Sequence, residues 1–253
     1  IGTHRPYSWA KYWSSAGARV TVLTACKKQF DAPLDLSLPK LSSVSVIEVP
    51  YGGISIAGNS FMKHQVLRQA AKKIKSLVNK QTGFVVDPRA AWHPAALRIA
   101  RELAQDCEIV VSTFGPAAAH LIACDMKRAN PSLRWIADYR DLWSQRRTEA
   151  LTKRQRKSLR KKELDSVGKY ADFLTAVSSD LTSQLRELTE KRVELVPNGF
   201  DIDEPTLRSL IFLSEKSSNQ PFRIVYTGML YSGHQDPTPL LDAIVTLKGK
   251  GEI

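Results

Sequence analysis

The feature that most constrains the fold of this sequence is an alternation of short β-branched runs with longer stretches of helical spacing. Parallel strands need crossover connections, and helices usually provide them. The alternation therefore predicts an α/β fold with a doubly wound parallel sheet. The helical stretches cover residues 90–104, 117–128, 152–167 and 179–188. The strand-like runs cover residues 20–24, 44–49, 109–113, 135–138, 174–177, 193–196 and 224–227.

A change in composition near residue 200 predicts a boundary between two domains. The turn-forming pair Asn198 and Gly199 follows a strand-like run, and a polar stretch at 214–221 precedes the next one. We predict a Rossmann-like domain at 1–200, a linker at 201–221 and the start of a second Rossmann-like domain at 222–253. No strand precedes the first helical segment, and the second domain has room for barely one β-α unit. We therefore expect the first domain to lack its first strand and the second to be truncated.

Charge and hydropathy narrow the class of protein. Lysine plus arginine number 37 and aspartate plus glutamate number 25, which gives a net charge of +12. Such a surplus predicts an anionic partner. No apolar run reaches the roughly 18 residues that a membrane span needs, and no signal-peptide pattern occurs. We therefore expect a cytoplasmic protein without a membrane span.

Two basic stretches, residues 61–80 and 146–162, carry much of this charge. Basic amphipathic helices are attracted to anionic lipids, so we predict peripheral binding to the inner face of a membrane. The alternative for each stretch is a solvated helix whose apolar face packs on the core. Neither stretch interleaves aromatic residues with the cations, so we expect no nucleic-acid partner.

The cysteines and histidines do not form metal-ligand patterns. The three cysteines lie far apart and form no Cys-x-x-Cys pair, which favours structural thiols in a reducing compartment. The histidines also lack the spacing of zinc ligands, so we expect no metal cofactor. The residues concerned are Cys26, Cys107, Cys124, His4, His64, His93 and His234.

A polar group of residues, Asp138, Arg140 and Asp141, lies at the end of a predicted strand. Ligands of parallel sheets bind at the carboxyl ends of strands, where a carboxylate can bind sugar hydroxyls and an arginine can bind phosphate. A structural alternative is that Asp141 caps a following helix and Arg140 forms an ion pair. His120, in the first turn of a predicted helix, could contact an acceptor or the transferred sugar, or could simply be packed.

Gly2 and Arg5 lie where the chain enters its first predicted helix. A glycine lets the backbone approach a phosphate, a helix N-terminus carries partial positive charge, and Arg5 adds a fork of donors. An ordinary turn would explain Gly2 equally well. Asn198 has a similar pair of explanations, a crossing between domains at a ligand site or a left-handed turn followed by Asp201 as a helix cap.

Several segments carry a resemblance to a known family: GTHRPYSWAK at 2–11, VTVLT at 20–24, STFGP at 112–116, WIADYRDLW at 135–143, VS at 177–178, PNGFD at 197–201 and YTGMLY at 226–231. In kind and order they resemble family 4 glycosyltransferases. The resemblance implies the GT-B arrangement, in which two Rossmann-like domains face each other across a cleft. It also implies retaining transfer of a sugar from a nucleotide-sugar co-substrate, without a further cofactor. The implied acceptor is a saccharide, and a lipid-linked sugar in cell-surface polysaccharide synthesis would suit the basic stretches.

The resemblance also implies roles for individual residues. The chain departs from the family pattern in one loop, where Met229 and Leu230 stand at positions at which the family often has a basic residue for the diphosphate. The implied roles are catalysis for Asp141 and His120, acceptor contacts for Asp138 and Arg140, and donor contacts for Gly2, Arg5, Asn198 and Gly228.

Two other functions are compatible with the residues. A nucleotide-sugar epimerase of related two-domain architecture would turn over a sugar nucleotide without any acceptor. A non-enzymatic, basic Rossmann-like module would bind polyanions with a steep salt dependence and release no nucleotide. If the chain belongs to a transferase, we expect the 253 residues alone to be inactive, because the cleft needs both domains.

Overall fold

The computed structural model of the chain describes residues 3–26, 38–51, 78–85, 87–145, 151–199, 204–212, 223–226 and 236–252. The chain divides into two compact units. The first unit consists of Ile1–Gln145 and Leu151–Asp201, and the second of Arg146–Ala150 and Ile202–Ile253.

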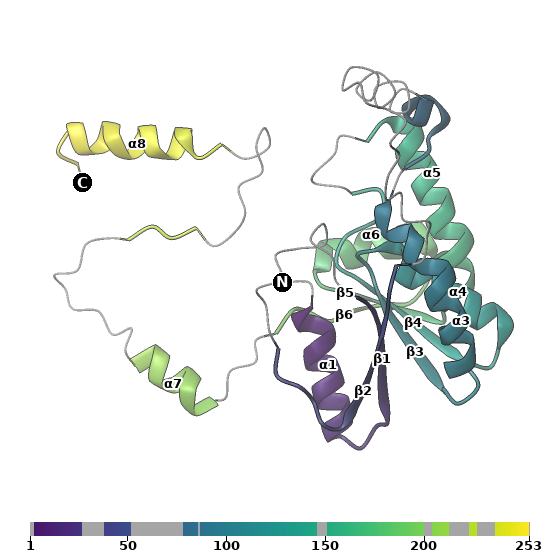
Figure 1. The fold of residues 1–253 in the computed structure, drawn as a ribbon. Coiled ribbons are helices and arrows are strands. Elements are labelled where there is room, and N and C mark those ends of the chain that lie inside the picture. The colour runs from purple at the N-terminus through teal and green to yellow at the C-terminus, as the bar shows by residue number, and fades with distance from the viewer. Residues whose placement is uncertain are drawn as a thin grey trace, which may run out of the picture. The chain divides into compact units, whose positions relative to one another are not determined.

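The first unit alternates strands with helices along the chain, as the sequence predicts (Figure 1). Each strand expected before residue 200 is present, to within one residue at either end. The strands are β1 (Val20–Ala25), β2 (Val44–Val49), β3 (Ile109–Thr113), β4 (Arg134–Tyr139), β5 (Phe173–Ala176) and β6 (Val193–Leu195). The helices are α1 (His4–Ser15), η1 (Pro88–Trp92), α3 (His93–Leu103), α4 (Ala117–Ala129), α5 (Lys153–Glu163), the π-helical turn η2 (Leu164–Gly168) and α6 (Ser179–Thr189).

All strand pairs in the described residues are parallel. β1 pairs with β2, and β3, β4, β5 and β6 form a four-stranded sheet in that order. Leu23 of β1 and Val110 of β3 pack against the same hydrophobic cluster, so the two sheets share a core. The α/β architecture with parallel strands is therefore confirmed, and it is compatible with a Rossmann-like fold.

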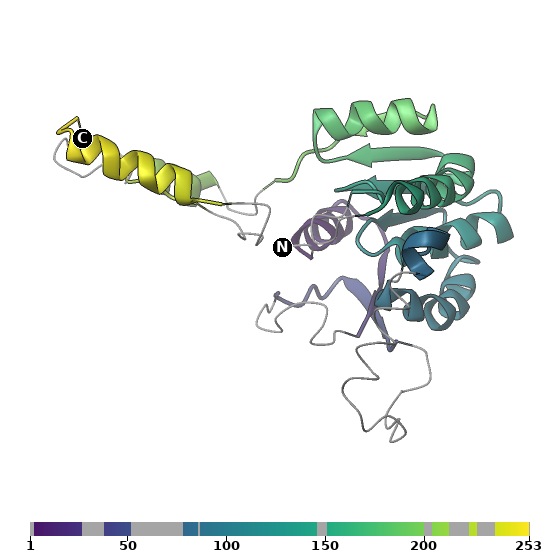
Figure 2. The same cartoon turned by 90° about the horizontal axis from the view of Figure 1, so that it is seen from above.

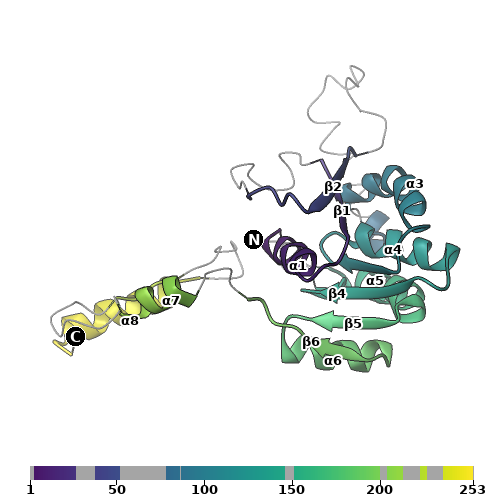
Figure 3. The same ribbon diagram turned by 90° about the horizontal axis from the view of Figure 1, so that it is seen from below.

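Helices lie on both faces of the four-stranded sheet. Successive residues of a strand point to opposite faces, so each strand presents side chains to the helices on both sides. Trp135, Ala137 and Tyr139 of β4 pack with residues of α4, η2 and α6 in the larger core cluster. Asp138, between them, points the other way and contacts Arg5 of α1. In Figures 1 and 3, α1 on one side and α3 and α4 on the other flank the strands. α6, light green in Figure 2, runs beside β6.

Two helices of the first unit begin at side-chain caps. Thr152 and Gln155 form a capping box at the start of α5, with the Gln155 N–H donating to Thr152 Oγ1 at 3.2 Å and the Thr152 N–H donating to Gln155 Oε1 at 3.1 Å. Ser178 Oγ accepts a hydrogen bond from the Leu181 N–H at 3.3 Å at the start of α6. Such caps contribute about 0.5–2 kcal/mol each and fix where a helix begins.

The second unit contributes two helices to the described residues, α7 (Glu204–Phe212) and α8 (Thr238–Gly249). α7 lies inside the range that we expected to be a linker. The strand expected at 224–227 is wrong for its described part: residues 223–226 have no regular structure, and Ile224 and Val225 are 54% and 68% exposed. A β-branched run becomes a stable strand only when neighbouring strands pair with it, and no described residue pairs with this one.

Candidate functional site

A buried carboxylate at the end of β4 collects side chains from three other elements. Arg5 of α1 donates from Nη2 to Asp138 Oδ1 at 2.8 Å and from Nε to Oδ2 at 3.1 Å, which makes a two-point ion pair. Thr113 of β3 donates its hydroxyl to Oδ2 at 3.0 Å, and Thr175 of β5 donates its hydroxyl to Oδ1 at 2.7 Å. Asp138 is fully buried. Protein donors thus occupy both oxygens of this carboxylate, and its predicted contact with acceptor hydroxyls stays a prediction.

The register of the sheet explains this convergence. Thr113 lies opposite Asp138, and Asp138 lies opposite Thr175. Opposite residues on neighbouring strands point to the same face of a sheet. Three polar side chains from three strands therefore meet near the carboxyl ends of the strands, on the face that α1 covers.

Arg5 also connects this carboxylate to the segment after β6. Its Nη1 donates to the carbonyl oxygen of Pro197 at 3.1 Å and to Asn198 Oδ1 at 3.4 Å. The guanidinium lies over the Trp9 ring, 4.3 Å from the ring centroid, in a cation–π contact. Because Arg5 is buried and its donors point at protein acceptors, the structure shows it as a contact that positions α1. Its predicted role in phosphate binding stays a prediction.

Arg140 lies further along the same edge of the sheet and is partly exposed. Its Nε and Nη2 both donate to the carbonyl oxygen of Phe114, at 3.2 Å and 2.6 Å. Gly115 has a φ of +100°, and a Cβ there would lie 3.0 Å from Arg140 Nη2, so glycine lets the guanidinium approach this turn. Burial lowers the pKa of Arg140, while the nearby Asp138 and Asp141 raise it. An arginine remains protonated under such a shift.

Asp141 follows Arg140 and is partly buried. A turn comes after it, closed by a hydrogen bond from the Gln145 N–H to the Leu142 carbonyl at 3.0 Å. No helix begins between residues 141 and 145, so the helix-capping alternative finds no support in this described stretch. The predicted role of Asp141 in catalysis stays a prediction.

His120 of α4 is fully buried behind the β3–β4 pair. Its Nδ1 is 2.7 Å from Ser112 Oγ, which also accepts a hydrogen bond from Trp135 Nε1 at 2.8 Å. Burial lowers the pKa of His120 from 6.5 to about 3, so the ring is neutral near pH 7. Ser112 and Thr113 are successive strand residues and point to opposite faces of the sheet, so His120 does not share a face with Asp138. Its predicted contact with a substrate stays a prediction.

A second buried acid, Glu163, lies at the end of α5 next to Tyr139 and Trp143. It is fully buried, and neither carboxyl oxygen has a hydrogen-bond partner. Burial raises the pKa of Glu163 from 4.5 to about 7, while the Tyr139 hydroxyl, the Trp143 main-chain N–H and Arg160 lower it. The hydroxyl and the N–H thus lower the pKa of the carboxyl without forming hydrogen bonds to it.

The structure brings some of the predicted site residues together and separates others. Arg5 contacts both Asp138 and Asn198, and Arg140 and Asp141 continue the same edge. His120 is on the opposite face of the sheet. Gly2 and Gly228 lie outside the described residues.

Sequence reasoning missed three residues of this region, namely Thr113, Thr175 and Glu163. Thr113 ends the strand predicted at 109–113, and that position was the available signal, whereas Thr175 lies inside the strand predicted at 174–177. The strand register that aligns them with Asp138 is not visible in the sequence. Glu163 was hidden by its neighbours, because it ends a run of exposed cations and resembles another solvated charge.

An open depression of about 590 Å³ lies along one face of α1. It contains none of the predicted site residues. Among the described residues, histidines, cysteines and acids form no group that could hold a metal ion. The residues that line the depression are His4, Tyr7, Lys11, Leu38, Pro39 and Leu41.

α5 carries a dense set of exposed cations, which we call the α5 basic surface. Lys161 pairs with Asp165 at 3.1 Å, and Arg154 donates to the Gln81 carbonyl at 3.0 Å. Most of the other basic stretch, residues 61–77, and residues 146–150 lie outside the described ranges. No described helix is both long enough and apolar enough to cross a membrane. The α5 basic surface consists of Lys153, Arg154, Arg156, Lys157, Arg160, Lys161 and Lys162.

Comparison of the sequence with protein-family models gives no match, and comparison with curated proteins gives none either. The fold and the site by themselves define an α/β protein of parallel sheets, with a polar cluster at the carboxyl ends of its strands.

Proposed function

We propose that this protein is a retaining GT-B glycosyltransferase similar to family 4, and that its first unit binds the acceptor. It would move a sugar from a nucleotide-sugar donor to a saccharide, lipid-linked or free, in the synthesis of cell-surface polysaccharides or glycoconjugates. Two findings support the proposal: the ordered sequence segments that resemble the family, and an α/β architecture in which ligands bind at the carboxyl ends of strands.

The observation that carries the proposal is the contact of Arg5 with both Asp138 and Asn198. The three residues come from three separate segments of the resemblance. Asp138 lies 133 positions from Arg5 in the chain, and Asn198 lies 193 positions from it. A chance likeness of short segments would give no reason for them to meet. Their convergence at one edge of the sheet is what a shared binding site requires.

Arg140 and Asp141 are the residues best placed to contact substrate. Arg140 is held by the Phe114 carbonyl, remains charged and is partly exposed, so it can stabilise a phosphate or bind a sugar hydroxyl. Asp141, next to it, can accept hydrogen bonds from hydroxyls. Arg5 and Asp138, which are buried, would keep this edge rigid so that the acceptor is oriented correctly.

The chemical step needs no pair of protein acids. In retaining transfer of this kind, the acceptor oxygen forms a bond to the anomeric carbon as the bond from that carbon to the diphosphate oxygen breaks. The departing phosphate takes the proton of the acceptor hydroxyl. The protein would contribute orientation and stabilisation of the departing charge by cations and amides.

We also propose that the protein docks on the cytoplasmic face of an anionic membrane through the α5 basic surface. Its side chains are exposed, and each cation near such a surface adds on the order of 1 kcal/mol of attraction. α5 exposes no aromatic side chain for base stacking, and its one amide, Gln155, is buried and engaged with Phe84 and Thr152. Lipid headgroups therefore suit this surface better than nucleic acid.

The test uses the complete product of the gene, purified and mixed with a panel of nucleotide sugars and a lipid extract. We expect release of nucleoside diphosphate that depends on the acceptor, together with labelled sugar in the extract. Arg140→Ala should lower this transfer at least about tenfold, whereas Arg101→Ala on the exposed side of α3 should leave it unchanged. Acceptor-independent interconversion of sugar nucleotides would instead indicate an epimerase. Salt-sensitive polyanion binding without nucleotide release would indicate a binding module.

A further inference from the structure

We propose that Phe114 is a positioning residue for the candidate acceptor site: its main chain and its ring hold the segment from Asp138 to Trp143 and so fix Arg140 at the edge of the sheet. The consequence for sugar transfer rests on the proposed function. The positioning itself does not, because it concerns contacts within the first unit.

The main chain of Phe114 contacts this segment through both of its polar groups. The N–H donates to the carbonyl oxygen of Asp138 at 2.9 Å, which extends the pairing of β3 with β4 one residue beyond Thr113. The carbonyl oxygen accepts hydrogen bonds from Arg140 Nε at 3.2 Å and from Arg140 Nη2 at 2.6 Å. Two N–H groups on one acceptor fix the plane of a guanidinium, so this partly exposed arginine is held in one orientation.

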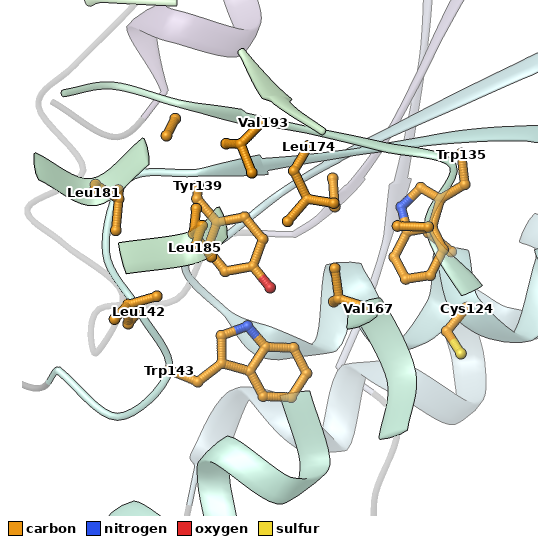
Figure 4. Packing of buried hydrophobic residues seen from close by; sticks show 14 residues of the cluster. Cys124, Trp135, Tyr139, Leu142, Trp143, Val167, Leu174, Leu181, Leu185 and Val193 are labelled. Carbon is orange, nitrogen blue, oxygen red and sulfur yellow. The ribbon is translucent and has the colours of Figure 1, made fainter. Parts of the chain in front are cut away.

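The ring of Phe114 contacts the segment on both sides of Arg140. Its centroid lies 6.2 Å from the ring centroid of Tyr139 and 6.1 Å from that of Trp143, and the ring planes differ by 14° and 13°. Such distances are those of favourable aromatic pairs in protein cores. Tyr139 and Trp143 are buried, and Figure 4 shows the Tyr139 hydroxyl pointing toward the indole nitrogen of Trp143. The Phe114 ring therefore anchors the segment before Arg140 and after Asp141.

The residue after Phe114 has to lack a side chain for this contact to form. Gly115 has a φ of +100°, and a Cβ there would lie 3.0 Å from Arg140 Nη2. A side chain would push the guanidinium away from the Phe114 carbonyl, in addition to the strain of a left-handed backbone. Gly17 has a similar φ of +92°, but no described atom lies within 4 Å of its Cβ position. The two glycines therefore allow the effect of the contact to be separated from the effect of backbone strain.

Packing alone does not explain this arrangement. Phe114 is partly buried and lies against the larger core cluster, as a residue that merely fills space also would. Filling space makes no demand on the main-chain carbonyl, yet this carbonyl accepts two hydrogen bonds from a charged donor. A cation that is held in place before substrate binds can stabilise developing negative charge without first reorganising. The contacts of Phe114 therefore suit a residue that prepares Arg140 for an anionic or polar substrate.

The test measures hydrogen exchange at the Arg140 Nε–H by NMR, with Arg140→Lys to identify the signal. The internal reference is the indole N–H of Trp135, which donates to Ser112 Oγ at 2.8 Å and reports general loss of stability. Phe114→Leu keeps the main chain but removes the ring, so exchange at Arg140 should become about tenfold faster relative to this reference. The matched control is Phe84→Leu, at a phenylalanine that is 60% exposed, and it should match the wild type.

Gly115→Ala and Gly17→Ala give a second comparison, which decides the matter if Phe114→Leu does not fold. Both variants place a Cβ on left-handed backbone, but only Gly115→Ala should speed exchange at Arg140 about tenfold relative to the reference. In the complete gene product, Gly115→Ala should also lower transfer about tenfold. Because Gly115 acts through Arg140, the double variant with Arg140→Ala should be no slower than Arg140→Ala alone.

Two results would overturn the proposal: a wild-type exchange rate at Arg140 in folded Phe114→Leu, or equal rates in Gly115→Ala and Gly17→Ala. A double variant that is slower than Arg140→Ala would count against the role in transfer. If the wild type transfers no sugar, the proposed function fails, and the exchange comparison still decides whether Phe114 holds the segment.

Discussion

Arg5 and Asp138 form a buried ion pair, although 133 positions separate them in the chain. The pair joins the first turn of α1 to the end of β4. A buried ion pair adds little net stability compared with an apolar pair, but it is costly to break, because the remaining charge is left without a partner. The contact therefore specifies where α1 sits against the carboxyl ends of the strands.

Replacing Asp138 with Asn should destabilise the protein strongly. The change keeps the size of the side chain but leaves the Arg5 guanidinium buried without its counter-charge, which costs about 3–5 kcal/mol. Urea unfolding of the variant and the wild type measures the difference. As a control, Arg192→Ala removes a pair with Glu194 of similar length, 2.7 Å against 2.8 Å for Arg5 and Asp138. The side chains of this control pair are 78% and 42% exposed, so its loss should cost less than about 1 kcal/mol.

A double variant checks that the cost comes from the pair. Arg5→Met combined with Asp138→Asn removes both charges, so the combined loss should be smaller than the sum of the two single losses by at least about 1 kcal/mol. Strictly additive losses would show that the two charges do not depend on each other.

Asp141→Asn tests the acceptor site by activity at constant stability. The variant removes one charge and keeps the shape. If Asp141 binds a sugar hydroxyl, transfer by the complete gene product should fall about ten- to a hundredfold, equivalent to about 1.5–3 kcal/mol, while the melting temperature stays the same. Asp165→Asn, at an exposed acid of η2, is the matched control and should leave transfer unchanged. Wild-type transfer in both Asp141→Asn and His120→Ala, at unchanged melting temperature, would place the site elsewhere.

Much of the first unit was predictable because its strands and helices follow from local patterns. The runs at 109–113 and 135–138 are β-branched or aromatic and are followed by helical spacing or polar residues, and both became strands of one parallel sheet. The run at 224–227 has the same local character, but its described residues form no strand. A run with high strand propensity forms a strand only when it pairs with a neighbouring strand. The sequence of one run does not show whether such a neighbour is present.

The candidate site was predictable only in part, for a related reason. Asp138 and Arg140 stand out because polar residues directly follow an apolar run. The partners that decide their state come from distant segments: Thr175 through strand register, and Arg5 through the packing of α1. These contacts bury Asp138 and occupy both of its carboxylate oxygens.

The α5 basic surface should bind anionic vesicles in a salt-dependent way. Binding should increase with the fraction of anionic lipid and fall as salt rises, because exposed charges are screened over about 8–10 Å at physiological ionic strength. Reversing four of its cations to Glu should weaken vesicle sedimentation at least about tenfold. The substituted residues are Arg154, Arg156, Arg160 and Lys161.

The control for this experiment changes net charge equally at exposed cations outside α5. It should bind vesicles more tightly than the α5 variant. Equal loss in both variants would show that net charge alone drives binding, and salt-insensitive binding to neutral vesicles would exclude an electrostatic surface. The control residues are Arg98, Arg101, Lys248 and Lys250, each changed to Glu.

The pH dependence of stability should separate the two buried titratable groups, Glu163 and His120. The folded state raises the pKa of Glu163 from 4.5 to about 7, so its stabilising contribution is complete below pH 4.5 and is lost as pH rises through 7. The folded state lowers the pKa of His120 from 6.5 to about 3, so its contribution is complete above pH 6.5 and is lost as pH falls toward 3. The two effects are on the order of 3 and 5 kcal/mol, and they oppose each other between pH 4.5 and 6.5.

Urea unfolding at intervals from pH 3 to pH 8 measures this opposition through variants. Relative to the wild type, Glu163→Gln should gain stability steadily as pH rises from 4.5 to 7, because the loss caused by Glu163 ionisation is absent. His120→Phe should show the reverse, with a relative gain as pH falls from 6.5 toward 3, because no buried imidazole has to be protonated. Ser112 keeps its hydrogen bond from Trp135 in that variant, so the comparison isolates the ring. Stability curves of Glu163→Gln and wild type that run parallel across pH 4.5–7 would show that the Glu163 carboxyl keeps an ordinary pKa in the folded protein.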